Sequence, residues 1–269
     1  MATKLKRMSM IAMIACLALI LPCVSTAAKL TLAEGINKAG RQRMLTQRMV
    51  KAYSQMGMDL RYQKSKKQLS ADVHLFEAQL AELHQFDISP GIKSGLAMVT
   101  SLWDPVKQIV TAEVDRRNLE HLRANAEKLL TASHQVVLTM QELSGTSQGK
   151  LVNISGRQRM LSQRISNLYT IQSWGFEKEP YISDYKKALG EFDDALKFLT
   201  AAPENTKAIS AALEKVTLQW GLFQHSASMK KGRYIPSLIS RSADKILVQM
   251  NTITGMYTSL PGKQAESTY

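Results

Sequence analysis

A ten-residue stretch that could bind an anion occurs twice in the sequence. Residues 40–49 (GRQRMLTQRM) recur as residues 156–165 (GRQRMLSQRI), 116 residues further along the chain, with eight of the ten positions identical. Each copy holds three arginines beside one glycine. The planar guanidinium group presents a fork of N–H donors that suits planar anions. A helix that only had to pack would not concentrate positive charge in this way twice, so we interpret the stretch as a candidate anion site.

The glycine of the motif suggests how the arginines could meet. A mid-helix glycine costs up to about 1 kcal/mol relative to alanine, and close approach of a second helix would justify it. If two such helices meet at Gly40 and Gly156, then Arg43 and Arg159 converge and repel each other unless an anion lies between them. In the alternative, the arginines reach solvent or pair with acids such as Asp72. The predicted site residues are Arg43, Arg159, Gly40, Gly156, Asn37, Asn153, Gln47 and Gln163, with Arg41, Arg48, Arg157 and Arg164 as secondary candidates.

The elements that must position these residues are predicted to be helices. Apolar residues recur at spacings of three and four, and aromatic residues make up only 6% of the chain, which favours an all-α protein. The pattern predicts helices over 29–57, 59–86, 92–116, 118–143, 150–176, 182–201, 203–230 and 236–260. Pro105 should kink or break the third helix near Trp103. Trp103 and Trp220, at matching positions, are expected to be core anchors.

The repeat divides this helical pattern into two domains. We expect two tandem four-helix bundles, over 29–145 and 150–262, because about 115 residues suffice for an independent core. Residues 144–149 (SGTSQG) have the composition of a short flexible linker between them.

The N-terminus indicates export. Residues 1–28 combine a basic start, an apolar run from Met8 to Leu21 and a small-residue end, as a secretory signal peptide does. We favour cleavage, and a periplasmic protein, over an uncleaved membrane anchor. No later apolar run is long enough to span a bilayer, so the mature protein should be soluble. Export argues against nucleic acid as the partner of the formal charge of +13.

Other chemistry is not indicated by the sequence. Both cysteines, Cys16 and Cys23, lie inside the signal, which excludes disulfides and thiolate sites from the mature chain. The five histidines lack metal-ligand spacing. No nucleophile elbow, phosphate-binding loop or dinucleotide fingerprint is present. We therefore expect no enzyme activity, no metal and no cofactor.

The repeated motif also resembles a known family. Asn-x-x-Gly-Arg-Gln-Arg-Met-Leu-[Ser/Thr]-Gln-Arg, beginning at Asn37 and Asn153, looks like the signature of the PilJ-type sensor domain of type IV pili methyl-accepting chemotaxis transducers. It is more distantly similar to the NarX-type nitrate sensors. The resemblance implies a four-helix sensor bundle. In the nitrate sensors, an arginine three residues after the glycine contacts nitrate from each of two facing helices, and Arg43 and Arg159 match it.

Two functional hypotheses follow. In the first, the chain is an exported, non-enzymatic sensor or binding protein that takes up a small anion, nitrate or nitrite first. Since the sequence carries no output domain, it would relay to a membrane receptor of the chemotaxis or two-component kind. The two arginines would come together in a homodimer or in an intramolecular pseudo-dimer. In the second hypothesis, the chain is a periplasmic interaction or chaperone-like protein, and the motif only packs helices.

Overall fold

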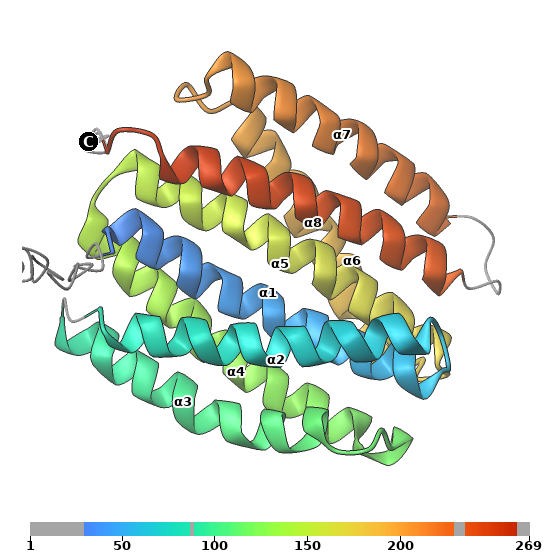
Figure 1. Cartoon of the computed structure of the whole chain (residues 1–269). Coiled ribbons are helices and arrows are strands. Elements are labelled where there is room, and N and C mark those ends of the chain that lie inside the picture. The colour runs from blue at the N-terminus through green and yellow to red at the C-terminus, as the bar shows by residue number, and fades with distance from the viewer. Residues whose placement is uncertain (1–29, 87–88, 229–234, 263–269) are drawn as a thin grey trace, which may run out of the picture.

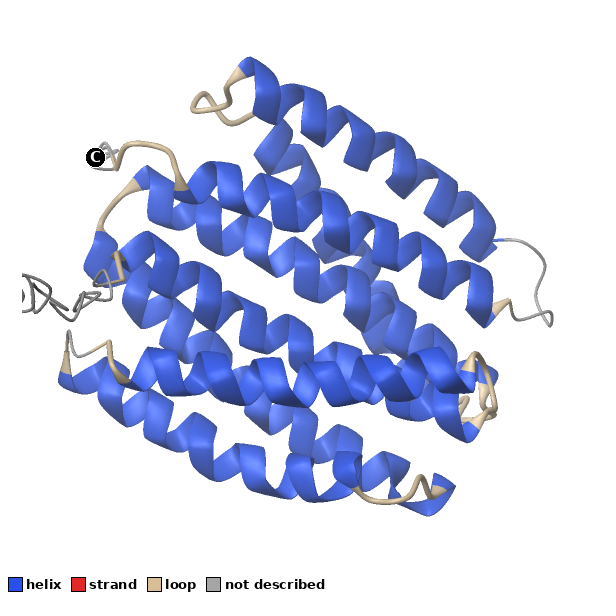
Figure 2. Ribbon diagram, viewed as in Figure 1, coloured by secondary structure: helices blue, strands red, loops and turns tan. Residues whose placement is uncertain are grey.

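The described part of the chain is all-α. A computed structural model describes residues 30–86, 89–228 and 235–262, and the regular secondary structure in these ranges is entirely helical (Figure 2). The helices of the first half are α1 (Leu32–Gly57), α2 (Tyr62–His84), α3 (Pro90–Thr111), the short 3₁₀ helix η1 (Arg116–Asn118) and α4 (Leu119–Ser144). Those of the second half are α5 (Ser147–Ser173), α6 (Glu179–Thr200), α7 (Lys207–Ser228) and α8 (Pro236–Thr258). The prediction of two tandem four-helix bundles is thereby confirmed.

The two motif helices, α1 and α5, form the centre of the molecule. They run side by side and make the most extensive contact between any two described helices (Figure 1). Helices α2 and α4 also pack on α1, and α6 and α8 pack on α5. The outer helices α3 and α7 pack mainly on α4 and α8. The first helices of the two repeats therefore face each other within one chain.

Local sequence signals explain where several helices begin. Thr31 forms a capping box with Glu34: its hydroxyl accepts from the Glu34 N–H at 3.2 Å, and the Glu34 carboxylate accepts from the Thr31 N–H at 2.7 Å. Thr146 caps α5 by accepting from the Gly149 N–H at 3.0 Å. Pro236 occupies the first turn of α8, where the missing N–H costs nothing.

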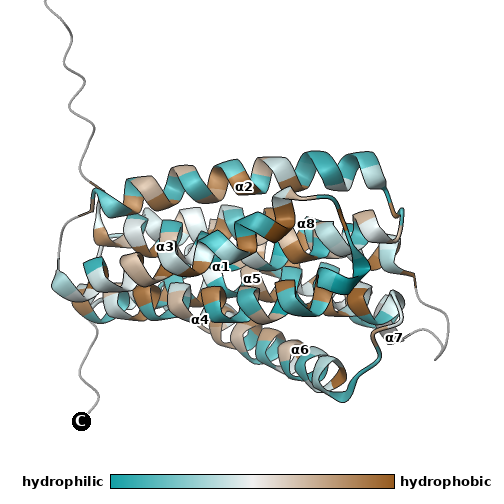
Figure 3. Ribbon diagram, turned by 90° about the horizontal axis from the view of Figure 1, so that it is seen from below, coloured by the Kyte–Doolittle hydropathy of each residue, from teal (hydrophilic) through white to brown (hydrophobic). Residues whose placement is uncertain are grey.

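Each bundle has its own aromatic core, built alike in the two repeats. The rings of Phe76 and Trp103 have centroids 4.2 Å apart, and those of Phe192 and Trp220 are 4.1 Å apart. Both tryptophans are almost fully buried. Each indole N–H donates at 3.3 Å to an acid, Glu77 or Asp193, so its polar end is satisfied. The prediction that the two tryptophans are core anchors is confirmed. Figure 3 shows hydrophobic and hydrophilic residues alternating along the helices.

Several predicted boundaries were wrong. Helix α3 continues through Pro105 and ends at Thr111, not at Arg116. The carbonyl that Pro105 leaves without its usual donor belongs to exposed Ser101, where water can reach it. Helix α7 begins at Lys207 rather than at Pro203, because the Thr206 hydroxyl caps it by accepting from the Ile209 N–H at 3.3 Å.

The predicted linker is shorter than expected. Only Gly145 and Thr146 separate α4 from α5, and Gly145 adopts the left-handed conformation that ends a helix, with φ of 58°. The proposed signal over residues 1–28 lies outside the described residues. Within the ranges described, none of the helices combines the length and apolar character needed to cross a bilayer.

Candidate functional site

Helices α1 and α5 meet at their motif glycines, with the two motif arginines between them. A Cβ added to Gly40 would stand 3.2 Å from Nη2 of Arg43 and 3.6 Å from Nη2 of Arg159. A Cβ added to Gly156 would stand 3.2 Å from Nη2 of Arg159 and 3.7 Å from Nη2 of Arg43. The glycines thus make room for both guanidinium groups, which converge on one point of the interface.

Each arginine reaches across to the other repeat. Arg43 Nη2 donates to the Asn153 carbonyl at 3.4 Å, and Arg159 Nη2 donates to the Asn37 carbonyl at 3.1 Å. Because Asn37 and Asn153 occupy equivalent positions, these two bonds are related by the pseudo-twofold symmetry of the duplication. Both asparagines therefore reach the arginines through their backbone. Their side chains are engaged elsewhere, with Thr258 at 3.4 Å and Gln141 at 2.6 Å.

The outer nitrogens of the two arginines are held by side chains that the sequence analysis missed. Arg43 Nη1 bonds to His134 Nδ1 at 2.9 Å, and Arg159 Nη1 donates to Asn251 Oδ1 at 3.0 Å. The two partners lie 117 residues apart, on α4 and α8, so they are also equivalent. That offset was visible in the sequence, but nothing there marked an isolated histidine and an asparagine as partners of the motif.

Arg43 and Arg159 are buried cations without a counter-ion. They are the two largest fully buried side chains of the described chain, with 1% and 0% of their surface exposed. No carboxylate among the described residues forms an ion pair with either, and Nε of each lacks a hydrogen-bond partner. Burial lowers the pKa of both side chains to about 9, helped by the nearby charge of Arg157 on Arg43 and of Arg41 on Arg159. Both still carry their charge at neutral pH.

His134 is neutral beside Arg43. Burial, reinforced by the charges of Arg43 and Arg157, lowers the pKa of its imidazole to about 4. A guanidinium can only donate, so Nδ1 must accept and the imidazole proton lies on Nε2. The hydrogen-bond partners of the arginine pair are therefore all neutral acceptors.

The motif glutamines form a second polar layer between α1 and α5. Gln47 accepts from Asn167 at 3.1 Å and donates to Glu127 at 3.3 Å. Gln163 accepts from Lys51 Nζ at 2.6 Å, and Lys51 also pairs with Asp244 at 2.7 Å. Lys51 and Asn167 occupy equivalent positions, so this polar layer is pseudo-symmetric except for the charge of Lys51.

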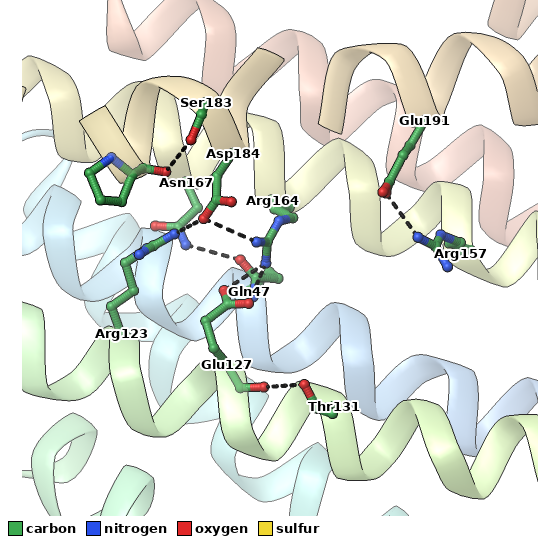
Figure 4. Close-up of polar contacts among 11 residues, drawn as sticks. Gln47, Arg123, Glu127, Thr131, Arg157, Arg164, Asn167, Ser183, Asp184 and Glu191 are labelled. Atoms are coloured by element: carbon green, nitrogen blue, oxygen red, sulfur yellow. Dashed lines mark hydrogen bonds and ion pairs between the residues drawn. The ribbon is translucent and has the colours of Figure 1, made fainter. Parts of the chain in front are cut away.

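The secondary candidates behave differently from the central pair. Arg48 pairs with the fully buried side chain of Asp72, with Nε donating at 2.9 Å, and Arg157 pairs with Glu191 at 2.9 Å. Arg164 pairs with Glu127 at 2.6 Å and with Asp184 at 3.4 Å (Figure 4). Arg41 donates only to the Asn251 side chain, at 3.4 Å. The ion-pair alternative thus describes three of the secondary arginines and neither of the central ones.

The fold and the repeated, buried arginine site define a helical-bundle protein built from two copies of one domain. The family model PilJ, described as the N-terminal region of type IV pili methyl-accepting chemotaxis transducers, matches residues 25–136 and again residues 139–237, and the chain belongs to this family. No curated protein and no solved structure matches the chain. The likeness to the nitrate sensors stays a prediction.

Proposed function

We propose that the chain is an exported tandem sensor domain that binds a small planar anion, with nitrate or nitrite as the first choice. The observation that carries this proposal is the pair of fully buried guanidinium groups without a carboxylate partner. A buried charge is stable only when it is paired. Two such cations side by side are best explained by an anion that neutralises both.

The chemistry of the proposed site suits a small oxyanion. The Nε of each arginine is an unused donor, and the Nη2 atoms lie beside glycines whose missing Cβ atoms leave room for them. Planar oxyanions match the fork of a guanidinium. In this proposal Gly40 and Gly156 provide space, the carbonyls of Asn37 and Asn153 orient the arginines, and Gln47 and Gln163 hold the helices.

Membership in a transducer family supports a sensory rather than a catalytic role, and a periplasmic location with the signal over residues 1–28. We propose that the protein relays anion binding by docking on a membrane receptor.

Titration calorimetry of the chain lacking residues 1–28, with nitrate, nitrite, sulfate and acetate, tests the anion proposal. Arg43→Met and Arg159→Met should each weaken nitrate or nitrite binding by about tenfold to a hundredfold, as expected for one lost charge-assisted hydrogen-bond pair. Arg117→Met removes the same charge from an exposed side chain and is the matched control. Absence of binding by every anion, or binding that survives the double substitution, would sink the proposal.

One observation favours the second candidate function, in which the motif only packs helices. The bonds from Arg43 to Asn153 and from Arg159 to Asn37 already join the two repeats in the described structure. Under this hypothesis both arginines are structural, and their loss should destabilise the fold whether or not an anion is present.

A further inference from the structure

The duplication produces two equivalent grooves on opposite faces of the α1–α5 pair. Helices α2 and α8 flank one face, which is turned toward the viewer in Figure 1, and α6 and α4 flank the other. A cavity lies in each: the α2–α8 groove is lined by Lys64, Arg241, Asp244, Lys245, Val248 and Gln249, and the α4–α6 groove by residues that include Glu127, Arg164 and Asp184. Because the grooves share one origin, their differences point to selection on one of them.

The α4–α6 groove is neutral and closed by ion pairs. Its charged lining consists of Arg157, Arg164 and Lys187 against Glu127, Asp184 and Glu191. Arg123 of α4 pairs with Asp184 of α6, and Arg164 joins Asp184 to Glu127 (Figure 4). Its cavity measures only about 160 Å³.

The α2–α8 groove has lost two of these three acids and keeps one, because Asp244 occupies the position equivalent to Glu127. Gln68 occupies the position equivalent to Asp184, and Leu75 the position equivalent to Glu191. Arg241 stands where the other repeat has Ala124, and Lys64 where it has Pro180. Ala71 and Ser240 in turn replace Lys187 and Arg123, so the excess positive charge of this groove comes from the lost acids. Its cavity measures about 480 Å³, within the range of ligand-binding clefts.

The cations of the α2–α8 groove are exposed and free. Lys64, Arg241 and Lys245 form no ion pair with any described residue. The single acid of the lining, Asp244, is engaged from below by the buried Lys51. Any acidic group that enters the groove would therefore meet three uncompensated positive charges.

Two further features of the groove restrict the kind of partner. Oε1 of Gln249 is buried and lacks a hydrogen-bond donor, so the occupant should offer an N–H or O–H. Val248 is 67% exposed and offers apolar contact between the cations. The diester phosphates of lipids and the internal phosphates of polyphosphate offer acceptors for the cations but have no O–H to donate to Gln249 at neutral pH. A polypeptide has both carboxylates and backbone N–H groups.

We infer that the α2–α8 groove docks an acidic segment of a partner protein. Carboxylates of that segment contact Lys64, Arg241 and Lys245, and one of its N–H groups donates to Gln249. This groove would be the surface through which the protein docks on its membrane receptor. Only the signalling consequence of docking rests on the proposed function. Beneath the groove, Asp244 forms an ion pair with Lys51, and Lys51 donates a hydrogen bond to Gln163 between α1 and α5. These two contacts connect the groove to the α1–α5 interface.

The probe for this inference is a short, fluorescently labelled polyglutamate peptide, with binding followed by anisotropy in the absence of nitrate and nitrite. The double variant Lys64→Glu/Lys245→Glu should weaken binding by about tenfold or more, because opposite charges become like charges. The matched control is Lys128→Glu/Lys187→Glu, which makes the same change of net charge on the α4–α6 side and should leave the affinity within about twofold.

Gln249→Met separates a peptide from other polyanions. It should weaken polyglutamate binding and leave any binding of inorganic polyphosphate unchanged. Equal losses in the two double variants would mean that the peptide follows only net charge, and would overturn the inference. So would polyphosphate, or vesicles of anionic lipid, that bind this groove while polyglutamate does not. Because no small anion is present, these outcomes are independent of whether Arg43 and Arg159 bind nitrate.

Discussion

Arg43 and Arg159 each donate a hydrogen bond to the backbone of the helix that carries the other. Arg43 donates to Asn153 on α5, and Arg159 donates to Asn37 on α1. The exchange brings two buried positive charges together at the motif glycines of α1 and α5. Since proximity of like charges opposes association of the helices, the rest of the interface must offset this repulsion, or an anion must remove it.

Replacing both arginines distinguishes the two proposed functions. In buffer free of small oxyanions, Arg43→Met/Arg159→Met should leave the free energy of unfolding unchanged or raise it by about 1–4 kcal/mol, because two uncompensated buried charges are removed. Nitrate should then no longer stabilise the variant. Urea denaturation with and without nitrate measures both effects. A loss of several kcal/mol in both buffers would favour a packing role for the motif.

Replacing the motif glycine with alanine should stabilise the fold less than the same replacement at a glycine that has open space around it. Gly190, in the middle of α6, has open space around its missing Cβ, so Gly190→Ala should raise the free energy of unfolding by about 0.5–1 kcal/mol through helix propensity. Gly40→Ala gains the same propensity but brings a methyl group to 3.2 Å from Arg43 Nη2. We expect a smaller gain or a small loss, together with weaker anion binding. Equal gains at both positions would contradict the close approach.

Two of the acids that pair with motif arginines, Asp72 and Glu191, should differ in their contribution to stability. The side chain of Asp72 is fully buried against Arg48, whereas Glu191 keeps 31% of its side chain exposed beside Arg157. Asp72→Ala leaves a largely buried cation unpaired and should cost about 3 kcal/mol or more. Glu191→Ala should cost under about 1 kcal/mol, as surface pairs do. Chemical denaturation at neutral pH compares them, and similar losses would count against the burial argument.

His134 should make the protein acid-sensitive. Its pKa is about 4 in the fold against 6.5 for an ordinary imidazole, so between these pH values the unfolded chain binds more protons than the folded one. Stability therefore falls as the pH is lowered from 6.5 to 4, by roughly 1–2 kcal/mol after allowance for the partly exposed ring. His134→Asn, which copies the equivalent Asn251, should flatten this slope.

The control for the pH prediction is His121, an exposed residue of the same helix. His121→Asn should keep the slope of the unmodified protein. An unchanged slope in His134→Asn would show that other groups cause the acid sensitivity.

The fold was largely predictable from the sequence because its outer helices are amphipathic. The apolar stripe through Val73, Phe76 and Leu80 gave α2 its correct face, and the repeat gave the second bundle from the first. Helix ends were predicted less well. The starts of α3 and α7 are capped by single hydroxyls, those of Ser89 and Thr206, and one cap residue does not alter the hydrophobic pattern from which a helix is predicted.

The environment of the motif could be predicted only in part. Its sequence indicated that Arg43 and Arg159 converge beside the glycines, as they do. It could not indicate that α1 is enclosed by other helices on nearly all sides, because its buried positions include polar residues such as Gln42 and Thr46 as well as apolar ones. The Gln42 side-chain N–H donates to the Phe76 carbonyl at 3.1 Å, a contact between two helices that local sequence does not encode.

The short connection between α4 and α5 makes formation of the arginine pair independent of protein concentration. A pair divided between two separate chains would form only as those chains associate, so it would vanish on dilution. Here Gly145 and Thr146 are all that separates the two repeats, and Arg43 meets Arg159 in every folded molecule. The fraction of folded molecules that contain the pair is thus the same at low and high protein concentration. Occupancy of the site would depend on the concentration of the ligand alone.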